Sequence, residues 1–372
     1  GNITLENGSD TDEEAVNANG SGNIRIDTLV GSVRINSDVL SGSGHITVKA
    51  GEDIDLASGV DVMTATTGTV SFDAETGALT MDGTANIEAT ASSVRLNAEL
   101  DMTIGSVSAT NVSILSDANV VNAAGSTKNV TATNLRIDAN GSVGLADRHL
   151  TTDIDNLSVL ASIGSIFITE DDDAIVTNVS VTVTEFNGDA TTAVVNDANQ
   201  SDLTTGLNGD IVLVVTTGAV VLNNGSDSNG ASVNANGAGR ILIDAQDGPL
   251  TANADLLSGT GLITLSANSD VTLSSGVDVA SAADISIIAA NGILAMDGSA
   301  NVAATGSAAR LASGLNLTVG NVSATNVSLV SGGSLLNAIG SSKNVTATNL
   351  RLASSGSIER IVRDRFDLHH GR

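Results

Sequence analysis

Residues 24–56 read IRIDTLVGSVRINSDVLSGSGHITVKAGEDIDL. Short runs in which apolar and polar residues alternate occur at 24–26, 33–35, 46–48 and 54–56. Alternation with a period of two, carried by isoleucine, valine and leucine, predicts short β-strands. The residues between the runs are rich in glycine, serine, asparagine and aspartate, which favour turns over helices. This stretch therefore predicts short strands joined by tight turns.

The same pattern recurs along the chain at a nearly constant spacing. The first runs of successive pairs begin at residues 24, 46, 70 and 94, so the steps are 22, 24 and 24 residues. A fixed period of this length is typical of solenoids, in which each coil stacks on the next. We predict an all-β fold, a right-handed single-stranded parallel β-helix with about 22 residues per coil and about 17 coils. An antiparallel β-sandwich array is the alternative, and it needs larger cores and frequent hairpin turns.

The composition fits a narrow solenoid and excludes several classes of protein. The 372 residues include four Phe, no Tyr, no Trp, no Cys and one Pro. A thin lumen has room for aliphatic side chains, and proline would remove a hydrogen bond from the strand ladder. Without cysteine there is neither a disulfide scaffold nor a thiolate metal site. A net charge of −27 repels phosphate backbones, so we expect no nucleic-acid partner. Runs of about 18 apolar residues are missing, so we expect no membrane span in this segment.

A much longer repeat contains these coils. Residues 1–26 match residues 218–243 at an offset of 217, and after a two-residue gap the offset becomes 215. Residues 107–113 and 128–136 are identical to 322–328 and 343–351. We therefore divide the chain into a first copy at 1–144, continuing coils at 145–217, a second copy at 218–358 and a discordant tail at 359–372.

Two segments depart from the coil pattern. Residues 179–195 read VSVTVTEFNGDATTAVV, and Asn187-Gly188 between alternating runs is a strong hairpin signal. We expect a β-hairpin that leaves the rod, or an irregular wide coil. The tail reads ERIVRDRFDLHHGR, and we expect it to cap the last coil loosely or to be poorly ordered. Because residue 1 is not methionine and no signal peptide is visible, we expect the chain to be a segment of a longer protein.

Asparagines recur at equivalent places in neighbouring coils. Asn111 and Asn134 are 23 residues apart, and Asn326 and Asn349 repeat this spacing in the second copy. Side chains one coil apart lie above one another, and stacked Asn amides hydrogen-bond along the stack. The sequence therefore predicts a structural amide ladder, with a ligand site there as the weaker alternative.

Two acidic clusters are candidate calcium sites. Carboxylates grouped on a loop supply the hard oxygen ligands that Ca²⁺ prefers. The competing interpretation is a solvated acidic turn, because the second-copy counterpart of the first cluster reads DSNGA at 227–231 and has lost most of its charge. No other cofactor is indicated. The candidate ligands are Asp10, Asp12, Glu13, Glu14, Asp171, Asp172 and Asp173.

Catalytic patterns are weak in this sequence. Sugar-cleaving enzymes use two carboxylates at a defined separation, and sugar subsites use aromatic platforms, which this composition lacks. Arg95 and Arg310 match across the copies, as do Arg136 and Arg351, but arginine on a coil surface commonly solubilises it or blocks an edge. We predict that the chain is not an enzyme. A carbohydrate-active lyase or glycosidase is the alternative, and an ice-binding solenoid with flat threonine ranks is a minor one.

Three motifs resemble a known family. GNIRID at 22–27, GSGHITV at 42–48 and NVTATNLR at 129–136 resemble coils of filamentous-haemagglutinin-like secreted repeat proteins. More narrowly, they resemble the giant surface β-helix proteins of planctomycetes and similar aquatic bacteria. The resemblance covers the chain to about residue 358 and reports coil geometry rather than chemistry. It implies an extracellular or bacterial cell-surface location and a structural or adhesive stalk. It also implies stacking end to end with neighbouring repeats and partners among cell-surface or matrix glycans and proteins.

Overall fold

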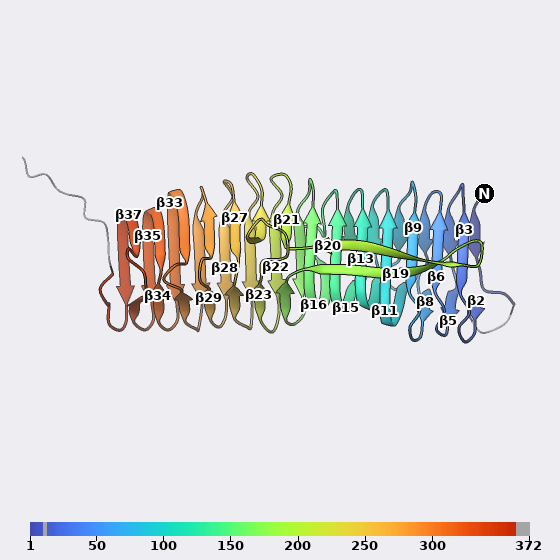
Figure 1. Cartoon of the computed structure of the whole chain (residues 1–372), viewed down its shortest axis with the longest axis horizontal. Coiled ribbons are helices and arrows are strands. Elements are labelled where there is room, and N and C mark those ends of the chain that lie inside the picture. The colour runs from blue at the N-terminus through green and yellow to red at the C-terminus, as the bar shows by residue number, and fades with distance from the viewer. Residues whose placement is uncertain (10–12, 362–372) are drawn as a thin grey trace, which may run out of the picture.

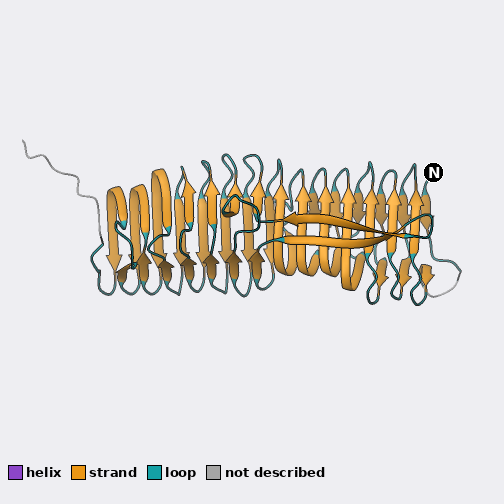
Figure 2. Cartoon of the chain, in the orientation of Figure 1, coloured by secondary structure: helices purple, strands orange, loops and turns teal. Residues whose placement is uncertain are grey.

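The computed structural model describes residues 1–9 and 13–361 of the 372-residue chain. These residues form strands, turns and connecting segments and no helix. Apart from one hairpin, the strands pair in parallel with strands one coil earlier and one coil later, which gives a long rod (Figures 1 and 2). The prediction of an all-β, solenoid-like fold is confirmed, and the parallel pairing excludes the antiparallel sandwich array.

Three rows of parallel strands enclose the core in the first copy. Row A contains β3 (Ile24–Thr28), β6 (Ile46–Ala50), β9 (Val70–Ala74) and the second halves of β11 (Asn86–Ala98), β13 (Ser106–Ser116), β15 (Val130–Ala139) and β16 (Leu150–Ala161). Row B contains β1 (Ile3–Leu5), β4 (Val33–Ile35), β7 (Ile54–Leu56), β10 (Leu79–Met81), β12 (Met102–Ile104) and β14 (Val120–Asn122). Row C contains β2 (Glu14–Ala18), β5 (Asp38–Ser41), β8 (Asp61–Thr64) and the first halves of β11, β13, β15 and β16.

Three rows also form the second copy, and they begin in the segment that joins the copies. The row equivalent in sequence to row A contains β17 (Ile166–Glu170), β22 (Ile211–Val215), β25 (Ile241–Ala245), β28 (Ile263–Ala267), β31 (Ile285–Ala289) and the second halves of β33 (Asn301–Ser313), β35 (Asn321–Ser331) and β37 (Val345–Ser354). A further row contains β18 (Ala174–Val176), β23 (Val220–Leu222), β26 (Leu250–Ala252), β29 (Val271–Leu273), β32 (Leu294–Met296), β34 (Leu317–Val319) and β36 (Leu335–Asn337). The last contains β21 (Leu203–Thr205), β24 (Ala231–Ala235), β27 (Asp255–Ser258), β30 (Asp278–Ser281) and the first halves of β33, β35 and β37.

The rows change sides between the copies. β17 pairs with the first half of β16, which belongs to row C. β22 pairs with β17, and β25 pairs with β22, so all three continue row C. In sequence, however, β25 at 241–245 corresponds to β3 of row A at an offset of 217. Equivalent faces of the two copies therefore lie on different sides of the rod.

The core is a continuous column of aliphatic side chains. Most short strands show the buried, half-exposed, buried pattern that alternation predicts, and one cluster of buried residues extends from Ile24 to Ala347. Burying each valine, isoleucine or leucine contributes about 1.5–3 kcal/mol relative to exposure. Phe72 is the one phenylalanine in this cluster, and it is fully buried on β9.

Glycines allow the turns of adjacent coils to stack closely. A Cβ atom placed on Gly44 would lie 1.9 Å from the carbonyl oxygen of Gly22, one coil below. The second copy repeats this arrangement, with 1.9 Å from Gly261 to the oxygen of Gly239. Only a residue without a side chain fits at this approach, so the glycine-rich turns are required by the stacking.

A β-hairpin is inserted in the coil between the two copies. β19 (Val179–Phe186) and β20 (Thr192–Gln200) pair in antiparallel register, as the Asn187-Gly188 signal indicates. β18 ends opposite Leu157 and β21 begins opposite Val159, so the hairpin interrupts what would otherwise be one strand on β16. The predicted hairpin is present and leaves the stack of coils, but it does not project away from the rod. It folds back toward the N-terminal end and lies along row A (Figures 1 and 2).

The hairpin residues do not contribute to the stack. Dividing the whole length by the coil period therefore overstates how many coils the rod contains. Of the tail at 359–372, only its first three residues are described, and Glu359 N–H donates to the carbonyl oxygen of Leu335 at 2.9 Å. The remainder of the tail lies outside the described residues.

Candidate functional site

Below the hairpin, the outward side chains of row A form a regular line. Register pairs one residue from each coil, and we call this line the first-copy seat: Arg25, Thr47, Ser71, Arg95, Ser113, Arg136 and Ser158. The hairpin buries Val179, Val181 and Val183 against this side of the rod. Alternation within β19 gives the hairpin an apolar face toward the rod and a polar face toward solvent.

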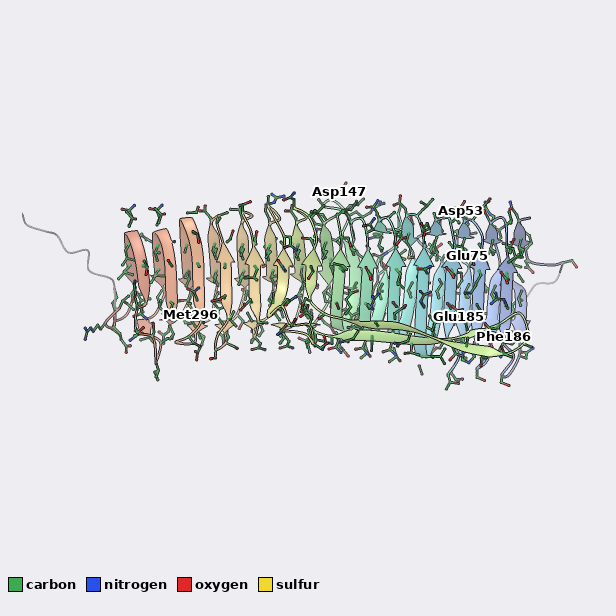
Figure 3. The ribbon with its side chains drawn as sticks, turned by 45° about the horizontal axis from the view of Figure 1, so that its top comes forward. Asp53, Glu75, Asp147, Glu185, Phe186 and Met296 are labelled. Atoms are coloured by element: carbon green, nitrogen blue, oxygen red, sulfur yellow. The ribbon has the colours of Figure 1, made fainter. Side chains whose placement is uncertain are left out.

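The tip of the hairpin is held by backbone and side-chain hydrogen bonds. Thr47 Oγ1 accepts from Phe186 N–H at 2.9 Å, and Arg25 Nη1 donates to the Phe186 carbonyl oxygen at 2.9 Å. Glu185 is almost fully buried, accepts from Ser71 Oγ at 2.8 Å and forms an ion pair with Lys49 at 2.9 Å. Figure 3 shows Glu185 and Phe186 at the end of the hairpin nearest the N-terminal coils.

Lys49 keeps its charge in this half-buried position. Burial lowers the pKa of Lys49, but hydrogen bonds and charges from Glu185 and Asp73 outweigh it and hold the pKa above its ordinary value. The ammonium group therefore stays charged beneath the tip and balances Glu185.

Arginines hold the base of the hairpin. Arg95 Nε lies 3.1 Å from both carboxylate oxygens of Asp197, and the two side chains are only 13% and 7% exposed. Arg136 Nε donates to the carbonyl oxygen of Ala198 at 3.2 Å, and Gln200 Nε2 donates to that of Ile137 at 2.8 Å. Removing one partner of such a sheltered ion pair leaves a charge without compensation, which is costly.

The same interface leaves some polar atoms without a hydrogen-bond partner. Within the described part of the chain these buried atoms are Ser113 Oγ, Arg136 Nη1 and Gln200 Oε1, all beneath or at the base of the hairpin. Each such atom costs about 1–3 kcal/mol of desolvation. The ion pairs and hydrogen bonds therefore stabilise the docked hairpin, and the desolvation of these three atoms offsets part of that free energy.

Asp202 fixes the point where the hairpin returns to the stack. It is fully buried, has a φ of 70°, and accepts from Gly225 N–H at 3.3 Å and Asn229 Nδ2 at 3.1 Å. Burial raises the pKa of Asp202 to about 6. No sequence pattern indicates a role for this residue beyond its place after the second hairpin run.

The four predicted ladder asparagines lie in register one coil apart. Asn134 Nδ2 donates to Asn111 Oδ1 at 2.8 Å, and Asn349 Nδ2 donates to Asn326 Oδ1 at 2.8 Å. The first ladder continues to Asn156, whose Nδ2 donates to Asn134 Oδ1 at 2.9 Å. Asn156 is not among the predicted ladder residues, although its spacing of 22 residues from Asn134 is the signal for it.

A second pair of asparagines has a larger structural role. Asn129 is fully buried, donates to the carbonyl oxygens of Ile104 and Gly105 and to Asn122 Oδ1, and accepts from Thr151 N–H at 2.9 Å. Asn344 repeats the donor contacts in the second copy. The signal was the spacing of seven residues between Asn122 and Asn129, which Asn337 and Asn344 share.

Carboxylates gather at one corner of the joining segment. Oxygens of Asp153, Glu170 and Asp172 lie within 4.8 Å of one another, and they are the hard ligands that Ca²⁺ prefers. Lys128 Nζ is already at this corner, 2.6 Å from Asp153 and 2.7 Å from Asp171. A calcium ion would therefore compete with an ammonium group for the same charges.

Glu170 is the unusual member of this corner. It is fully buried, and its carboxylate accepts from Thr152 Oγ1 and from Ile154 N–H. Burial outweighs these hydrogen bonds and raises the pKa of Glu170 to about 7. The carboxyl group thus exchanges its proton near neutral pH, which disfavours a permanently charged metal ligand.

The predicted calcium ligands that the structure describes do not converge on a single point. Asp172 joins the corner, Asp171 pairs with Lys128, and Asp173 Oδ1 accepts from Ala219 N–H at 2.6 Å. Glu13 has a φ of 65°, and Glu14 accepts from Asn17 Nδ2 at 2.7 Å. Asp10 and Asp12 lie outside the described residues.

Comparison of the chain with protein-family models, with curated proteins and with solved structures found no match in any of the three. Across residues 1–9 and 13–361, no helical segment long and apolar enough to cross a bilayer is present. The functional argument therefore rests on the geometry of the rod, its seat and its acidic corner.

Proposed function

We propose that this chain is a non-enzymatic structural or adhesive spacer of a large secreted or cell-surface protein, wound as a right-handed β-helix with about 22 residues per coil. One observation supports this most strongly: a single aliphatic core extends without a break from Ile24 to Ala347. Each coil buries its apolar face only against its neighbours, so length is gained coil by coil.

The surface of the rod suits a spacer. The chain has a net charge of −27 and a thin aliphatic core, and apart from a few buried carboxylates such as Glu170 and Asp202 its described acidic side chains lie outside that core. Like-charged rods repel one another, which keeps neighbouring stalks apart and soluble. Repeated coils offer long exposed faces for weak contacts with surface or matrix glycans and proteins, and divalent cations would bridge acidic faces.

The runner-up is a carbohydrate-active enzyme. Its best candidate is the corner of Asp153, Glu170 and Asp172, because an acid with a raised pKa beside further carboxyl groups is the pattern of glycoside hydrolysis. A general acid must reach the sugar, however, and Glu170 is fully buried with both oxygens engaged. The geometry therefore favours a structural role for this corner.

Ice binding is supported less. A flat threonine rank needs threonine at one place in many successive coils. The row C residues in register around Thr131 are Met63, Glu88, Ser108 and Asp153. Charged and bulky members interrupt that rank.

Rigidity tests the spacer proposal. Because the chain has no cysteine, Ser58→Cys and Ser275→Cys give two unique exposed sites one long repeat apart. Spin labels there should give one narrow distance distribution centred near about 40 Å, from about eight strand spacings of about 4.8 Å each. A broad distribution, or one that shifts to short distances in dilute buffer, would contradict a rigid spacer.

A further inference from the structure

The second copy retains the residues that seat the hairpin in the first copy. Register pairs one outward residue from each coil, and we call this line the second-copy seat: Thr264, Ser286, Arg310, Ser328 and Arg351. They are the sequence counterparts of Thr47, Ser71, Arg95, Ser113 and Arg136 at offsets of 217 and 215. The duplication thus kept the hydroxyl, hydroxyl, arginine, hydroxyl, arginine order of the seat.

The two seats differ in what covers them. Thr47, Ser71 and Ser113 are 0%, 1% and 0% exposed beneath the hairpin. Their counterparts in the second copy are half-exposed, and Arg310 and Arg351 are exposed. The chain's own hairpin cannot cover both seats, because it lies over row A and the second-copy seat is on the sheet that continues from β17.

The arginines of the second-copy seat point to an acidic occupant. Among the described residues, neither Arg310 nor Arg351 forms an ion pair with a carboxylate, whereas Arg95 holds Asp197. A surface hollow of about 300 Å³ lies between them, lined by Arg310, Asn326, Ser328, Asn349 and Arg351. A side chain in the place of Asp197 would enter this hollow and pair with Arg310.

The other end of the second-copy seat is largely apolar and lies beside the Arg240–Asp210 ion pair. Where Arg25 meets the hairpin tip in the first copy, Leu242 stands in the second, in register with Val212 and Phe167. A hollow of about 250 Å³ adjoins Leu242 and the 47% exposed Leu262. The ring of Phe186, at the tip of a hairpin, is the kind of group that fits there.

We propose that the second-copy seat docks a second copy of the β19–β20 hairpin, carried by another molecule of this chain. Asp197 of that hairpin pairs with Arg310, the carbonyl oxygen of Ala198 accepts from Arg351, and the Phe186 tip lies on Leu242. The unsatisfied atoms at Ser113, Arg136 and Gln200 lower the cost of releasing a hairpin from its own seat. The interaction joins rods laterally.

One difference between the seats allows binding to the first-copy seat to be distinguished from binding to the second-copy seat. Lys49, which pairs with Glu185 in the first copy, is replaced by Ser266 in the second. Glu185 therefore has a cation beneath it in the first-copy seat and none in the second. Replacing Glu185 by glutamine weakens docking to the first seat and leaves docking to the second unchanged or stronger.

A cyclised peptide of residues 178–201 tests the seat. Titrated into the full chain, it should bind with a stoichiometry of one, and Arg310→Ala with Arg351→Ala should weaken binding at least tenfold. A chain lacking residues 178–202 has both seats open, because Thr177 then joins β18 to β21 opposite Ser158, and it should bind two peptides. The Glu185→Gln peptide should lose only one of these two sites.

Two outcomes overturn the proposal for the seat. One is binding of a single peptide by the chain without residues 178–202 and none by the full chain. The other is equal binding of a scrambled peptide of the same composition, which would reduce the effect to charge. Sedimentation of full chains tests the source: association that rises with concentration and is lost with Arg310→Ala and Arg351→Ala is expected. Monomers at every concentration would overturn a second copy of this chain as the occupant.

Discussion

The two copies of the long repeat have the same kind of core, but they differ in whether a hairpin covers their outer surface. Both stack glycine-rich turns at the same close approach, both bury the Asn129 and Asn344 amides in the same contacts, and both fill the lumen with aliphatic side chains. Among the described residues, a hairpin covers the row of arginine and hydroxyl side chains in the first copy and not in the second. The buried core residues and the turn residues of the repeat therefore determine the coil. The matched surface residues of the two copies have different neighbours.

The comparison also distinguishes residues that stabilise the coil from residues that bind a neighbouring segment. Interior positions act alike in both copies because each coil meets only its neighbours. The outward arginines act differently, because Arg95 forms an ion pair with Asp197 whereas Arg310 is exposed to solvent. Substitutions at matched positions can therefore distinguish the two roles within one molecule.

Arginine truncation should give the largest difference between the copies. Arg95→Ala leaves Asp197 almost buried without its cation, and we expect the free energy of unfolding to fall by about 3 kcal/mol, unless the hairpin detaches first. Arg310→Ala removes an exposed side chain that forms no ion pair with a carboxylate of residues 1–9 and 13–361, so a change within about 0.5 kcal/mol is expected. Urea unfolding followed by circular dichroism measures both, because the chain has no Trp or Tyr for fluorescence.

Proteolysis in the 187–191 turn provides the control for detachment. The Arg95→Ala chain should be cut there faster than the Arg310→Ala chain. Equal losses of stability and equal rates of cleavage would show that the two arginines have the same environment. That result would contradict the difference between the two copies.

A smaller effect is expected at the joining segment, which has no counterpart in the second copy. Burial raises the pKa of Glu170 from 4.5 to about 7, so the folded state binds a proton more tightly than the unfolded state. The resulting stabilisation is complete below about pH 4.5 and is lost as the pH rises through about 7, with a magnitude of at most about 3 kcal/mol. Glu170→Gln should remove this part of the pH dependence and stabilise the chain above pH 7.

The exposed Glu75 on the first copy gives the matched control. Glu75→Gln removes the same charge from an exposed position, so it controls for the change in net charge when unfolding free energies are compared at pH 4.5 and pH 7.5. If Glu170→Gln changes the difference between these two free energies no more than Glu75→Gln does, the buried carboxyl does not titrate in this window.

Much of the fold follows from the sequence because coil geometry is local. The spacing of apolar runs predicts the strands, and an asparagine recurring after 23 residues predicts which amides stack. The path of the hairpin was not predictable, since the Asn187-Gly188 signal specifies a turn and contains nothing about Thr47, Arg95 or Arg136. The acidic corner was only partly predictable: Asp172 was a candidate, but Asp153 comes from an earlier strand that only register brings near. The burial of Glu170 also depends on that register.

Thiol accessibility tests the central comparison most directly. Ser113→Cys and Ser328→Cys each introduce the only cysteine, at matched positions of the two seats, one fully buried beneath the hairpin and one half-exposed. We expect a thiol reagent to modify Ser113→Cys at least a hundredfold more slowly than Ser328→Cys. Deletion of residues 178–202 should abolish that protection. Equal rates in the full chain would contradict a hairpin seated on the first copy alone.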